Sequence, residues 1–406
     1  MKRRHFLTSA TTSLAALSQT ASAESPAKPA PVAPELPAST TLTTTPPVVM
    51  APRADGAEIV WGVARHARGW VEVKQGTEVK SFGGSPFGFS TQGTKALRVR
   101  LHDLAPGTTH TYRTITEAMT DPASHEESPW RTLRTLAPTA EETQFLVWND
   151  THQNNETIKR LHAASPDSAN FLLWNGDICN DWHKEEQIIP TLLHPAGTDF
   201  TAQRPLFFVW GNHDLRGQYG YQLGDHVAAP EGRSYFAFRS GPVAVVCLNT
   251  GEDKDDDHPS FKGRVACEPL RKEQAAWLRS HVLTTPELRD APYRVVFCHL
   301  PLRWLNESEE GRTYDAFSRR SRDLWHDALV EWQAQIVISG HTHEHAWLPP
   351  LPKDGRPYAQ LVGGGPKPDA ATFIEAHANG ARLQFTMRNL QGEVLRQHEF
   401  SPLRTT

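Results

Sequence analysis

The feature that most constrains the fold is a series of short, almost wholly apolar runs after residue 140. Such runs lack the alternation of a half-exposed strand and are typical of strands buried on both faces of a sheet. They are QFLVW at 144–148, FLLW at 171–174, PLFFVW at 205–210, VAVVCL at 243–248, YRVVF at 293–297 and QIVIS at 335–339.

Helical patterns lie between several of these runs, with apolar residues three and four positions apart. They are NETIKRLHAA at 155–164, RKEQAAWLRSHV at 271–282 and RRSRDLWHDALVEWQ at 319–333. Strands that alternate with helices predict a layered α/β domain, which we place at residues 140–402. Three later segments are predicted to be closing strands of a second sheet: YAQLVGGG at 358–365, ARLQFTMRN at 381–389 and EVLRQHEF at 393–400.

Polar side chains follow five of the buried runs at the point where each run ends. In open α/β sheets ligands bind outside the carboxyl ends of the strands, so these side chains are expected to meet. One such residue alone could be an ordinary surface histidine or a helix cap, but five strand ends are not explained by capping. Carboxylate, imidazole and amide ligands without thiolates suit Mn, Fe, Co or Zn. The residues are Asp150, His152, Asp177, Asn212, His213, Asp214, His299, His341 and His343.

Residues 48–138 show short alternating segments separated by turn residues, which predict a small antiparallel β-sandwich. Within it, LHDLAPGTTHTYR resembles the corner of fibronectin type III domains, including those at the front of purple acid phosphatases. Leu104, Pro106 and Thr108 match that corner, and His110 stands where its tyrosine usually does. A passive spacer is the expected role of this module.

The first 23 residues are predicted to be an export signal. Arg3-Arg4 precede an apolar run that ends in Ala21-Ser22-Ala23, and the arginine pair resembles a bacterial twin-arginine signal. An ordinary secretory signal is the alternative, and both predict a periplasmic or secreted protein, the first with the twin-arginine export machinery as a partner. No apolar stretch of membrane-spanning length follows. Residues 24–47 are rich in proline and predict a disordered linker.

The net charge of −4, with both signs mixed along the chain, argues against a nucleic-acid-binding surface. The cysteines form no CxxC pair, so a zinc-thiolate site is not expected. The four cysteines are Cys179, Cys247, Cys267 and Cys298, and an oxidising compartment would permit three pairings among them. The apolar runs around Cys247 and Cys298 instead favour buried free thiols at these two positions.

Five blocks of residues, in order, resemble the signature blocks of the calcineurin-like metallophosphoesterase superfamily. The resemblance covers residues 143–350 and implies a four-layer α/β/β/α sandwich behind the small β-sandwich. The blocks are Asp150-x-His152, Gly176-Asp177, Gly211-Asn212-His213-Asp214, His299 and Gly340-His341-Thr342-His343.

The resemblance also implies the role of each block in a centre with two divalent ions (Mn, Fe, Zn or Co). One ion would be held by Asp150, His152, Asp177 and His343, and the second by Asp177, Asn212, His299 and His341. The ions would activate water to attack a phosphomonoester or phosphodiester, and His213 would give a proton to the leaving group.

Three further interpretations remain open at this stage. Asp214, Asn180 or Asp181 could orient His213, and Arg216 could be either a phosphate clamp or a surface arginine. The acidic stretch at 251–260 could bind calcium but lacks the EF-hand pattern, so a solvated loop at the rim of the site is favoured.

Within the superfamily, purple acid phosphatases carry a tyrosine where this chain has Asn180, so a ferric, coloured enzyme is not expected. The alternative to an enzyme is an exported binding or adhesion protein whose α/β domain is an inactive scaffold. The sequence does not indicate the substrate.

Overall fold

The computed structural model describes residues 41–85, 87–120, 124–305 and 315–404, which belong to one compact unit, Thr40–Thr406. The predicted export signal at 1–23 and most of the predicted linker lie outside the described residues. Within the described ranges, no helix is long and apolar enough to cross a bilayer.

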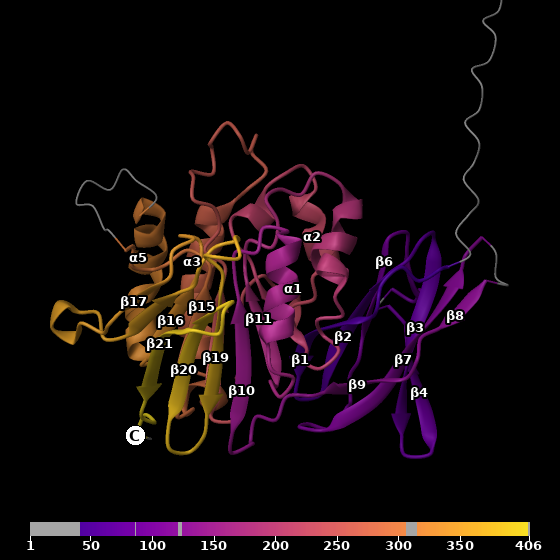
Figure 1. The fold of residues 1–406 in the computed structure, drawn as a ribbon, viewed down its shortest axis with the longest axis horizontal. Helices are drawn as coiled ribbons and strands as arrows, with labels where there is room; N and C mark the ends of the chain where they lie inside the picture. Colours follow the sequence, from indigo (N-terminus) through magenta and orange to yellow (C-terminus); the bar gives the residue numbers. More distant parts are fainter. Residues whose placement is uncertain (1–40, 86, 121–123, 306–314, 405–406) are drawn as a thin grey trace, which may run out of the picture. The chain divides into compact units, whose positions relative to one another are not determined.

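A nine-stranded sheet carries the first three buried runs, as predicted (Figure 1). In sheet order its strands are β21 (Val394–Phe400), β20 (Leu383–Asn389), β19 (Thr372–Ala378), β10 (Thr143–Trp148), β11 (Phe171–Asn175), β12 (Leu206–Val209), β1 (Val48–Arg53), β2 (Gly56–Gly62) and β6 (Ala96–Arg100). Because β10, β11 and β12 run parallel, their carboxyl ends lie at one edge.

A six-stranded sheet carries the other three runs. In order its strands are β13 (Phe236–Ser240), β14 (Val243–Leu248), β15 (Tyr293–Cys298), β16 (Ile336–Ser339), β18 (Ala359–Val362) and β17 (Ala346–Leu348). β14, β15, β16 and β18 are parallel neighbours. Of the predicted closing strands, only β18 joins this sheet. β20 and β21 instead extend the nine-stranded sheet, because β19, which the sequence did not indicate, pairs antiparallel with β10.

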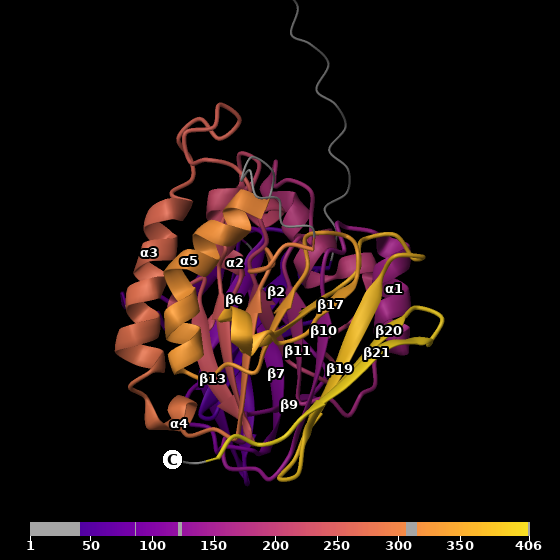
Figure 2. The ribbon, with the colours of Figure 1, turned by 90° about the vertical axis from the view of Figure 1, so that its left-hand side faces the viewer.

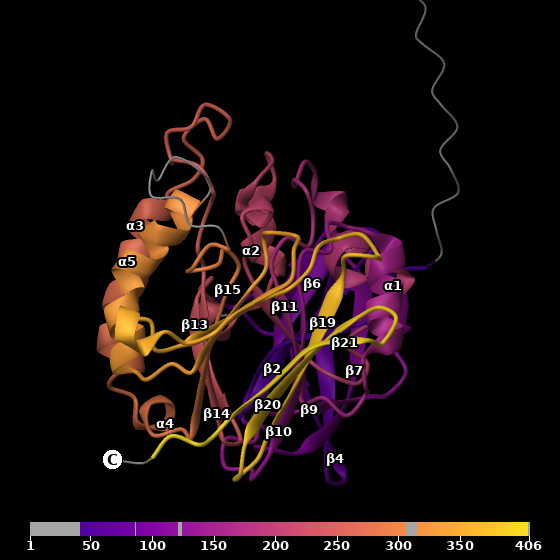
Figure 3. The same cartoon turned by 60° about the vertical axis from the view of Figure 1, so that its left-hand side comes forward.

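Helices cover the outer faces of the two sheets. They are α1 (Asn155–Ala164), α2 (Leu223–His226), α3 (Cys267–Trp277), α4 (Pro286–Arg289) and α5 (Asp315–Glu331). Figures 2 and 3 show α3 and α5 on one side, the strands between, and α1 on the opposite side. α1 begins after Asn154, whose side chain caps it by accepting the N–H of Thr157. The predicted four-layer α/β/β/α arrangement is confirmed.

Three apolar cores separate the four layers. The central core joins the two sheets: Phe145 stacks on Phe171 with ring centroids 4.9 Å apart and meets Phe297 of the other sheet at 6.1 Å. A second core, with Trp148 and Trp174, lies between the nine-stranded sheet and α1, and a third lies between the six-stranded sheet and α3 with α5. The sheets are therefore held face to face, with their parallel strand ends at the same edge.

The N-terminal strands form a β-sandwich that shares a sheet with the α/β part. A third sheet consists of β3 (Ala67–Gln75), β4 (Glu78–Phe82), β5 (Thr91–Gly93), β7 (Thr109–Ala118), β8 (His125–Glu127) and β9 (Arg131–Arg134). It packs on β1, β2 and β6, and Trp61 crosses the core to donate to Thr116 Oγ1 at 2.9 Å. β1 pairs with β12 at Met50 and Leu206, so backbone pairing crosses the boundary placed at residues 138–140. The division into two domains stays a prediction.

Two local predictions can be compared with this part of the structure. His110, at the corner position, donates from Nε2 to the Ala105 carbonyl at 3.1 Å, the kind of bond that a corner tyrosine makes. The predicted linker over 24–47 extends too far, because Leu42 is buried and its N–H donates to Glu126. Residues 41–47 therefore belong to the folded unit.

Candidate metal centre

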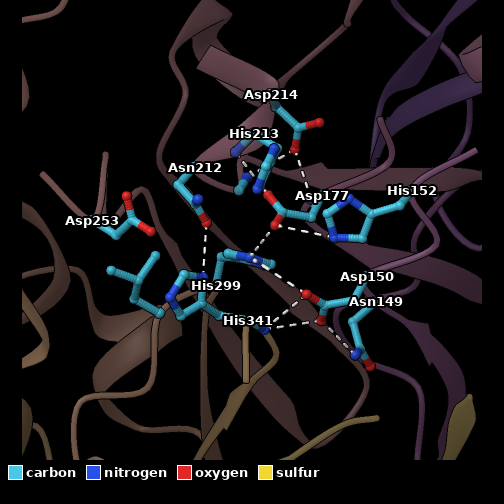
Figure 4. A network of polar contacts seen from close by, with 12 residues as sticks. Asn149, Asp150, His152, Asp177, Asn212, His213, Asp214, Asp253, His299 and His341 are labelled. Carbon is cyan, nitrogen blue, oxygen red and sulfur yellow. Dashed lines mark hydrogen bonds and ion pairs between the residues drawn. The ribbon is translucent and has the colours of Figure 1, made fainter. Parts of the chain in front are cut away.

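The polar residues of the sequence blocks come together where strands of both sheets end. Asp150, Asp177 and Asn212 follow β10, β11 and β12, whereas His299 and His341 follow β15 and β16 (Figure 4). Three groups of side chains result, and the ligand atoms within each lie within 4.8 Å of one another. We call one the His152 cluster, formed by Asp150, His152 and His343, and another the His299 cluster, formed by Asp177, His299 and His341. The third group, His152, Asp177 and His213, shares residues with both.

In the His152 cluster two imidazoles face the same point. The Nε2 atoms of His152 and His343 are 3.1 Å apart, and His343 Nε2 is 3.6 Å from Asp150 Oδ1. His152 Nδ1–H donates to Asn180 Oδ1 at 3.0 Å, which leaves Nε2 with a free lone pair. A nitrogen lone pair held in this way is a typical metal ligand.

In the His299 cluster the ring of His299 is buried, and its Nε2 has no hydrogen-bond partner among the described residues. Its Nδ1–H donates to the Asn175 carbonyl at 2.8 Å, so Nε2 is the nitrogen that faces the carboxylates and would supply a lone pair to a metal ion. This nitrogen lies 3.1 Å from Asp177 Oδ2 and 3.7 Å from Asp150 Oδ1. Asn212 joins the cluster, because its Oδ1 is 2.8 Å from His341 Nδ1.

Asp177 connects the two clusters. Its Oδ2 lies 3.5 Å from His152 Nε2 and 3.1 Å from His299 Nε2. Its Oδ1 accepts the backbone N–H of His213 at 2.9 Å. One carboxylate oxygen is thus next to a ring nitrogen from each cluster, in the place where the resemblance puts a bridging ligand.

The backbone at the site is held in an unusual conformation. Positive φ angles of 49° at Asp150, 43° at His152, 51° at Asp177, 71° at His341 and 59° at His343 lie in the left-handed region. Residues other than glycine rarely adopt it, and each instance costs about 1–3 kcal/mol unless the surroundings impose it. These turns direct side chains two or four residues past the end of a strand back toward the same point.

Two glycines of the blocks are required by close packing against the ligands. A Cβ at Gly211 would lie 2.3 Å from Asp177 Oδ1, and a Cβ at Gly340 would lie 2.1 Å from Asp150 Oδ2. Asp150 is also fixed from the other side by Asn149, whose Nδ2 donates to Asp150 Oδ2 and to the Gly364 carbonyl, both at 2.7 Å. The carboxylate therefore has little freedom to move.

The electrostatics of the site keep the rings of His152 and His341 neutral but favour positive charge at His299. Burial lowers the pKa of His341 to about 3 and that of His152 to about 4. Burial also lowers the pKa of His299, but the carboxylates of Asp177 and Asp150 outweigh this effect and raise the pKa to about 10. Positive charge is therefore attracted to the point between the two carboxylates.

The carboxylates themselves titrate in opposite directions. Burial raises the pKa of Asp150, and the attraction of His299 opposes it only in part. Burial also raises the pKa of Asp177, but His299 and the other histidines outweigh it and hold the net pKa below its ordinary value. Asp177 is accordingly the anionic centre of the site.

The donor set fits divalent transition-metal ions. It combines buried carboxylates, ring nitrogens with free lone pairs and an amide oxygen, with no thiolate at the site. The buried Nε2 of His299, without a hydrogen bond but next to two carboxylates, is an atom that a metal ion would satisfy. The clusters therefore support bound divalent ions.

His213 lies beside the clusters, and Figure 4 shows it next to Asp177. Its Nδ1–H donates to the Asn180 backbone carbonyl at 2.6 Å, and its Nε2 accepts from Arg216 Nη1 at 2.8 Å. Of the three groups predicted as candidates to orient this ring, Asn180 contacts it, through the main chain. Asp181 lies instead 3.7 Å from His183.

The side chain of Asp214 accepts hydrogen bonds from backbone N–H groups, and its described contacts do not include the ring of His213. Its buried carboxylate accepts the N–H groups of Asp177 and Gly211 at 2.9 Å and of Ile178 at 3.2 Å. Burial and the nearby Asp177 raise the pKa of Asp214 to about 8. Asp214 is one of the residues predicted as candidates to orient His213, but its contacts instead indicate a positioning residue that fixes the turns carrying Asp177 and Asn212.

Arg216 is held by two acidic residues that follow β14. Its Nε and Nη2 donate to the two carboxylate oxygens of Glu252, each at 2.9 Å, and Nη2 also donates to Asp253 at 2.7 Å. Only Nη1 is left to face His213, so the alternative of a surface arginine is wrong. Burial raises the pKa of Glu252 to about 7, and Arg216 lowers it only in part.

These acids are functional residues that the sequence interpretation missed. The solvated-loop prediction for 251–260 is wrong at Glu252 and Asp253, which are buried, and right for the exposed Asp255 and Asp257. A signal was present, because the pair comes shortly after a buried run, as the metal-capable residues do. These acids lie outside the blocks of the resemblance.

Two tryptophans near the site and the four cysteines have simpler surroundings. Trp182 is buried in the core beside α1, whereas the ring of Trp304 meets that of His341 at 5.7 Å. All four cysteines are buried and free.

A four-layer sandwich with carboxylate and imidazole side chains at its strand ends defines the metallophosphoesterase class of fold. The sequence model named "Calcineurin-like phosphoesterase" matches residues 143–345, half of the 406-residue chain. The chain belongs to the calcineurin-like phosphoesterase family.

Curated relatives include proteins named serine/threonine-protein phosphatase CPPED1. The human protein is 28% identical over 142 residues, which cover 35% of this chain and 42% of that protein. The mouse protein is 28% identical over 197 residues, which cover 47% and 58%. The chain thus spans about half the length of the curated relatives it matches.

Two solved structures share the fold at low sequence identity. The purple acid phosphatase PPD1 from yellow lupin (Lupinus luteus) has a TM-score of 0.65 and 13% identity, covering 87% of this chain and 74% of that one. The structure of PhoD has a TM-score of 0.61 and 13% identity, covering 91% and 90%. At this identity the likeness concerns the fold alone.

The contact at Gly340 gives a test of the metal centre. Gly340→Ala places a Cβ 2.1 Å from Asp150 Oδ2, so the carboxylate must shift and metal affinity should fall by about 10–100-fold. Metal content after dialysis, measured by elemental analysis, checks this. Gly380→Ala is the matched control, because its Cβ meets nothing within 4 Å. Unchanged metal content in folded Gly340→Ala would refute Asp150 as a ligand.

Proposed function

We propose that the protein is a metal-dependent phosphohydrolase that uses two divalent ions to hydrolyse a phosphomonoester or phosphodiester. The observation that carries the proposal is the place of Asp177, whose Oδ2 lies beside ring nitrogens of both His152 and His299. A carboxylate shared by two clusters is the arrangement that a two-metal hydrolytic site requires. The convergence of all seven predicted ligands supports an active site over an inactive scaffold.

The chain offers a ligand set for each ion. The His152 cluster with Asp177 would hold one ion, and the His299 cluster with Asn212 would hold the other. When bound, such ions supply positive charge to phosphoryl oxygens and make water acidic enough to provide hydroxide near neutral pH.

The residues beside the clusters bind the phosphate and move the proton. Arg216 presents Nη1 toward the site, because Glu252 and Asp253 occupy its other donors. In the free protein the Nδ1 of His213 faces the Asn180 carbonyl and its Nε2 faces Nη1 of Arg216. For His213 to donate a proton from Nε2, Nη1 must turn from the ring to a phosphoryl oxygen and Nε2 must take a proton from solvent. Binding of an anionic phosphate favours both changes.

The substrate is narrowed only to a phosphoester. The CPPED1 relatives, named serine/threonine-protein phosphatases, support a phosphomonoester as one candidate. Because the chain spans about half of their length, their activity is not transferred as a whole.

We further propose export to the periplasm or beyond through the twin-arginine route, supported by Arg3-Arg4 and the Ala21-Ser22-Ala23 pattern. Replacing Arg3 and Arg4 by lysine should retain the protein in the cytoplasm, which cell fractionation measures. Normal export of this variant would instead indicate the ordinary secretory route.

Removal of one predicted ligand tests the two-ion centre directly. Asn212→Ala should bind one ion fewer than the wild type and lose about a hundredfold or more of its turnover while remaining folded, because an amide ligand is absent. Metal analysis, circular dichroism and turnover of an aryl phosphate monoester and its matching diester, after loading with Mn, Fe or Zn, measure this. Asn155→Ala, at the exposed start of α1, is the control. Wild-type turnover in Asn212→Ala, or no hydrolysis of either ester by the loaded wild type, would contradict the proposal.

The anchoring of Arg216 gives a second test. In Glu252→Gln one of the two Glu252 oxygens that accept from the guanidinium is replaced by a donor, so Nη1 loses its fixed direction and kcat/KM should fall by about tenfold. Asp257→Asn, in the same loop but exposed, is the control. Equal steady-state kinetics for Glu252→Gln and the wild type would show that Arg216 does not bind the phosphate.

A further inference from the structure

A cavity of about 510 Å³ opens beside His213 and Arg216. It is large enough for a small organic group. Among the described residues that line it there is no predicted metal ligand, so the cavity begins at the residue proposed to protonate the leaving group. Whatever is attached to the leaving oxygen would therefore extend into this space.

The lining of the cavity combines apolar surface with cations. Leu215, Phe261 and Val265 supply the apolar part, and Phe261 is buried, which gives this part a fixed wall. Lys254, Arg216 and Arg264 supply three cationic groups, against a single acidic one from Asp181. The cavity thus suits a group that is partly apolar and carries negative charge.

The three cations differ in how far their charge is already compensated. Arg216 pairs with Glu252 and Asp253, and Lys254 Nζ lies 2.6 Å from Asp253 Oδ1. The Arg264 guanidinium donates to the Ser260 carbonyl at 3.2 Å and pairs with no carboxylate in the part of the chain that the structure describes. Arg264 is therefore the lining residue that would gain a charge partner from a ligand.

We propose that this cavity holds the leaving group of the substrate, and that Arg264 selects small phosphoesters whose leaving group carries a second anionic group, a carboxylate or a phosphate. The inference rests on the proposed function, because it takes His213 to lie on the leaving-group side. The apolar wall would pack against the body of the leaving group, and Arg264 would bind its charge with charge-assisted hydrogen bonds.

The test compares esters that differ only in this second charge. Purified, metal-loaded protein is assayed with meta-carboxyphenyl phosphate and meta-phenylene bisphosphate, whose second substituent is anionic, and with meta-carbamoylphenyl phosphate, whose second substituent is uncharged. The readout is the ratio of kcat/KM for each ester with an anionic substituent to that for the carbamoyl ester. Comparing this ratio between variants cancels the intrinsic reactivity of each ester.

The ratio should be about fivefold higher in the wild type than in Arg264→Gln, because the variant lacks the positive charge that pairs with the substituent. The effect is modest because Arg264 is exposed. Arg264→Lys should retain most of the preference, and high salt should reduce it. Lys262→Gln removes an exposed charge of the same loop outside the cavity lining and should leave the ratio unchanged.

Each outcome has a distinct meaning. Turnover of all esters with equal ratios in Arg264→Gln and the wild type would overturn the role of the cavity and leave the proposed function intact. A stronger Arg264-dependent preference for an acidic phosphopeptide than for the small anionic esters would overturn the small-molecule assignment. Hydrolysis of none of the esters would overturn the proposed function, and the role of the cavity with it.

Discussion

The buried carboxylate of Asp177 is the contact on which the rest of the site depends. It follows β11 of the nine-stranded sheet, yet one of its oxygens lies 3.1 Å from the Nε2 of His299, which follows β15 of the other sheet. Burying an anion is costly unless it is paired and hydrogen-bonded. His299, whose pKa the neighbouring carboxylates raise, and the backbone N–H of His213 compensate the charge, and Asp214 in turn fixes the backbone of Asp177. The contact between Asp177 and His299 therefore depends both on the packing of the two sheets and on the polar groups of the site.

The surroundings leave the ligands few alternatives. Left-handed backbone at five of them, and glycines with no room for a Cβ beside Asp177 and Asp150, mean that the side chains are placed before any ion arrives. A site organised in this way loses little conformational entropy on binding. Its cost is local strain, which the three apolar cores between the four layers can offset because they hold the strand ends in place.

The loop after β14 contacts Arg216 and lines the cavity beside this rigid centre. Its buried acids Glu252 and Asp253 direct Arg216, and its later residues Phe261 and Arg264 line the adjoining cavity. Metal binding and recognition of the leaving group are thus assigned to different segments. The first is built on the strand ends of the fold, whereas the second lies in a loop, where sequence can vary with less effect on the core.

The sequence alone determined the features that depend on neighbouring residues, and the tertiary structure decided the contacts between residues far apart in the chain. The apolar runs predicted the buried strands, because a strand buried on both faces needs apolar residues at consecutive positions. The polar residues that follow these strands were predicted to converge, because they come after the strand ends at Trp148, Asn175, Val209, Cys298 and Ser339. Only the tertiary structure decided that Glu252 anchors Arg216, that Asp214 binds the backbone of Asp177, and that β1 pairs with β12. Each of these contacts joins residues more than thirty positions apart, and a local pattern of residue types does not encode which distant partner a polar group or a strand edge will meet.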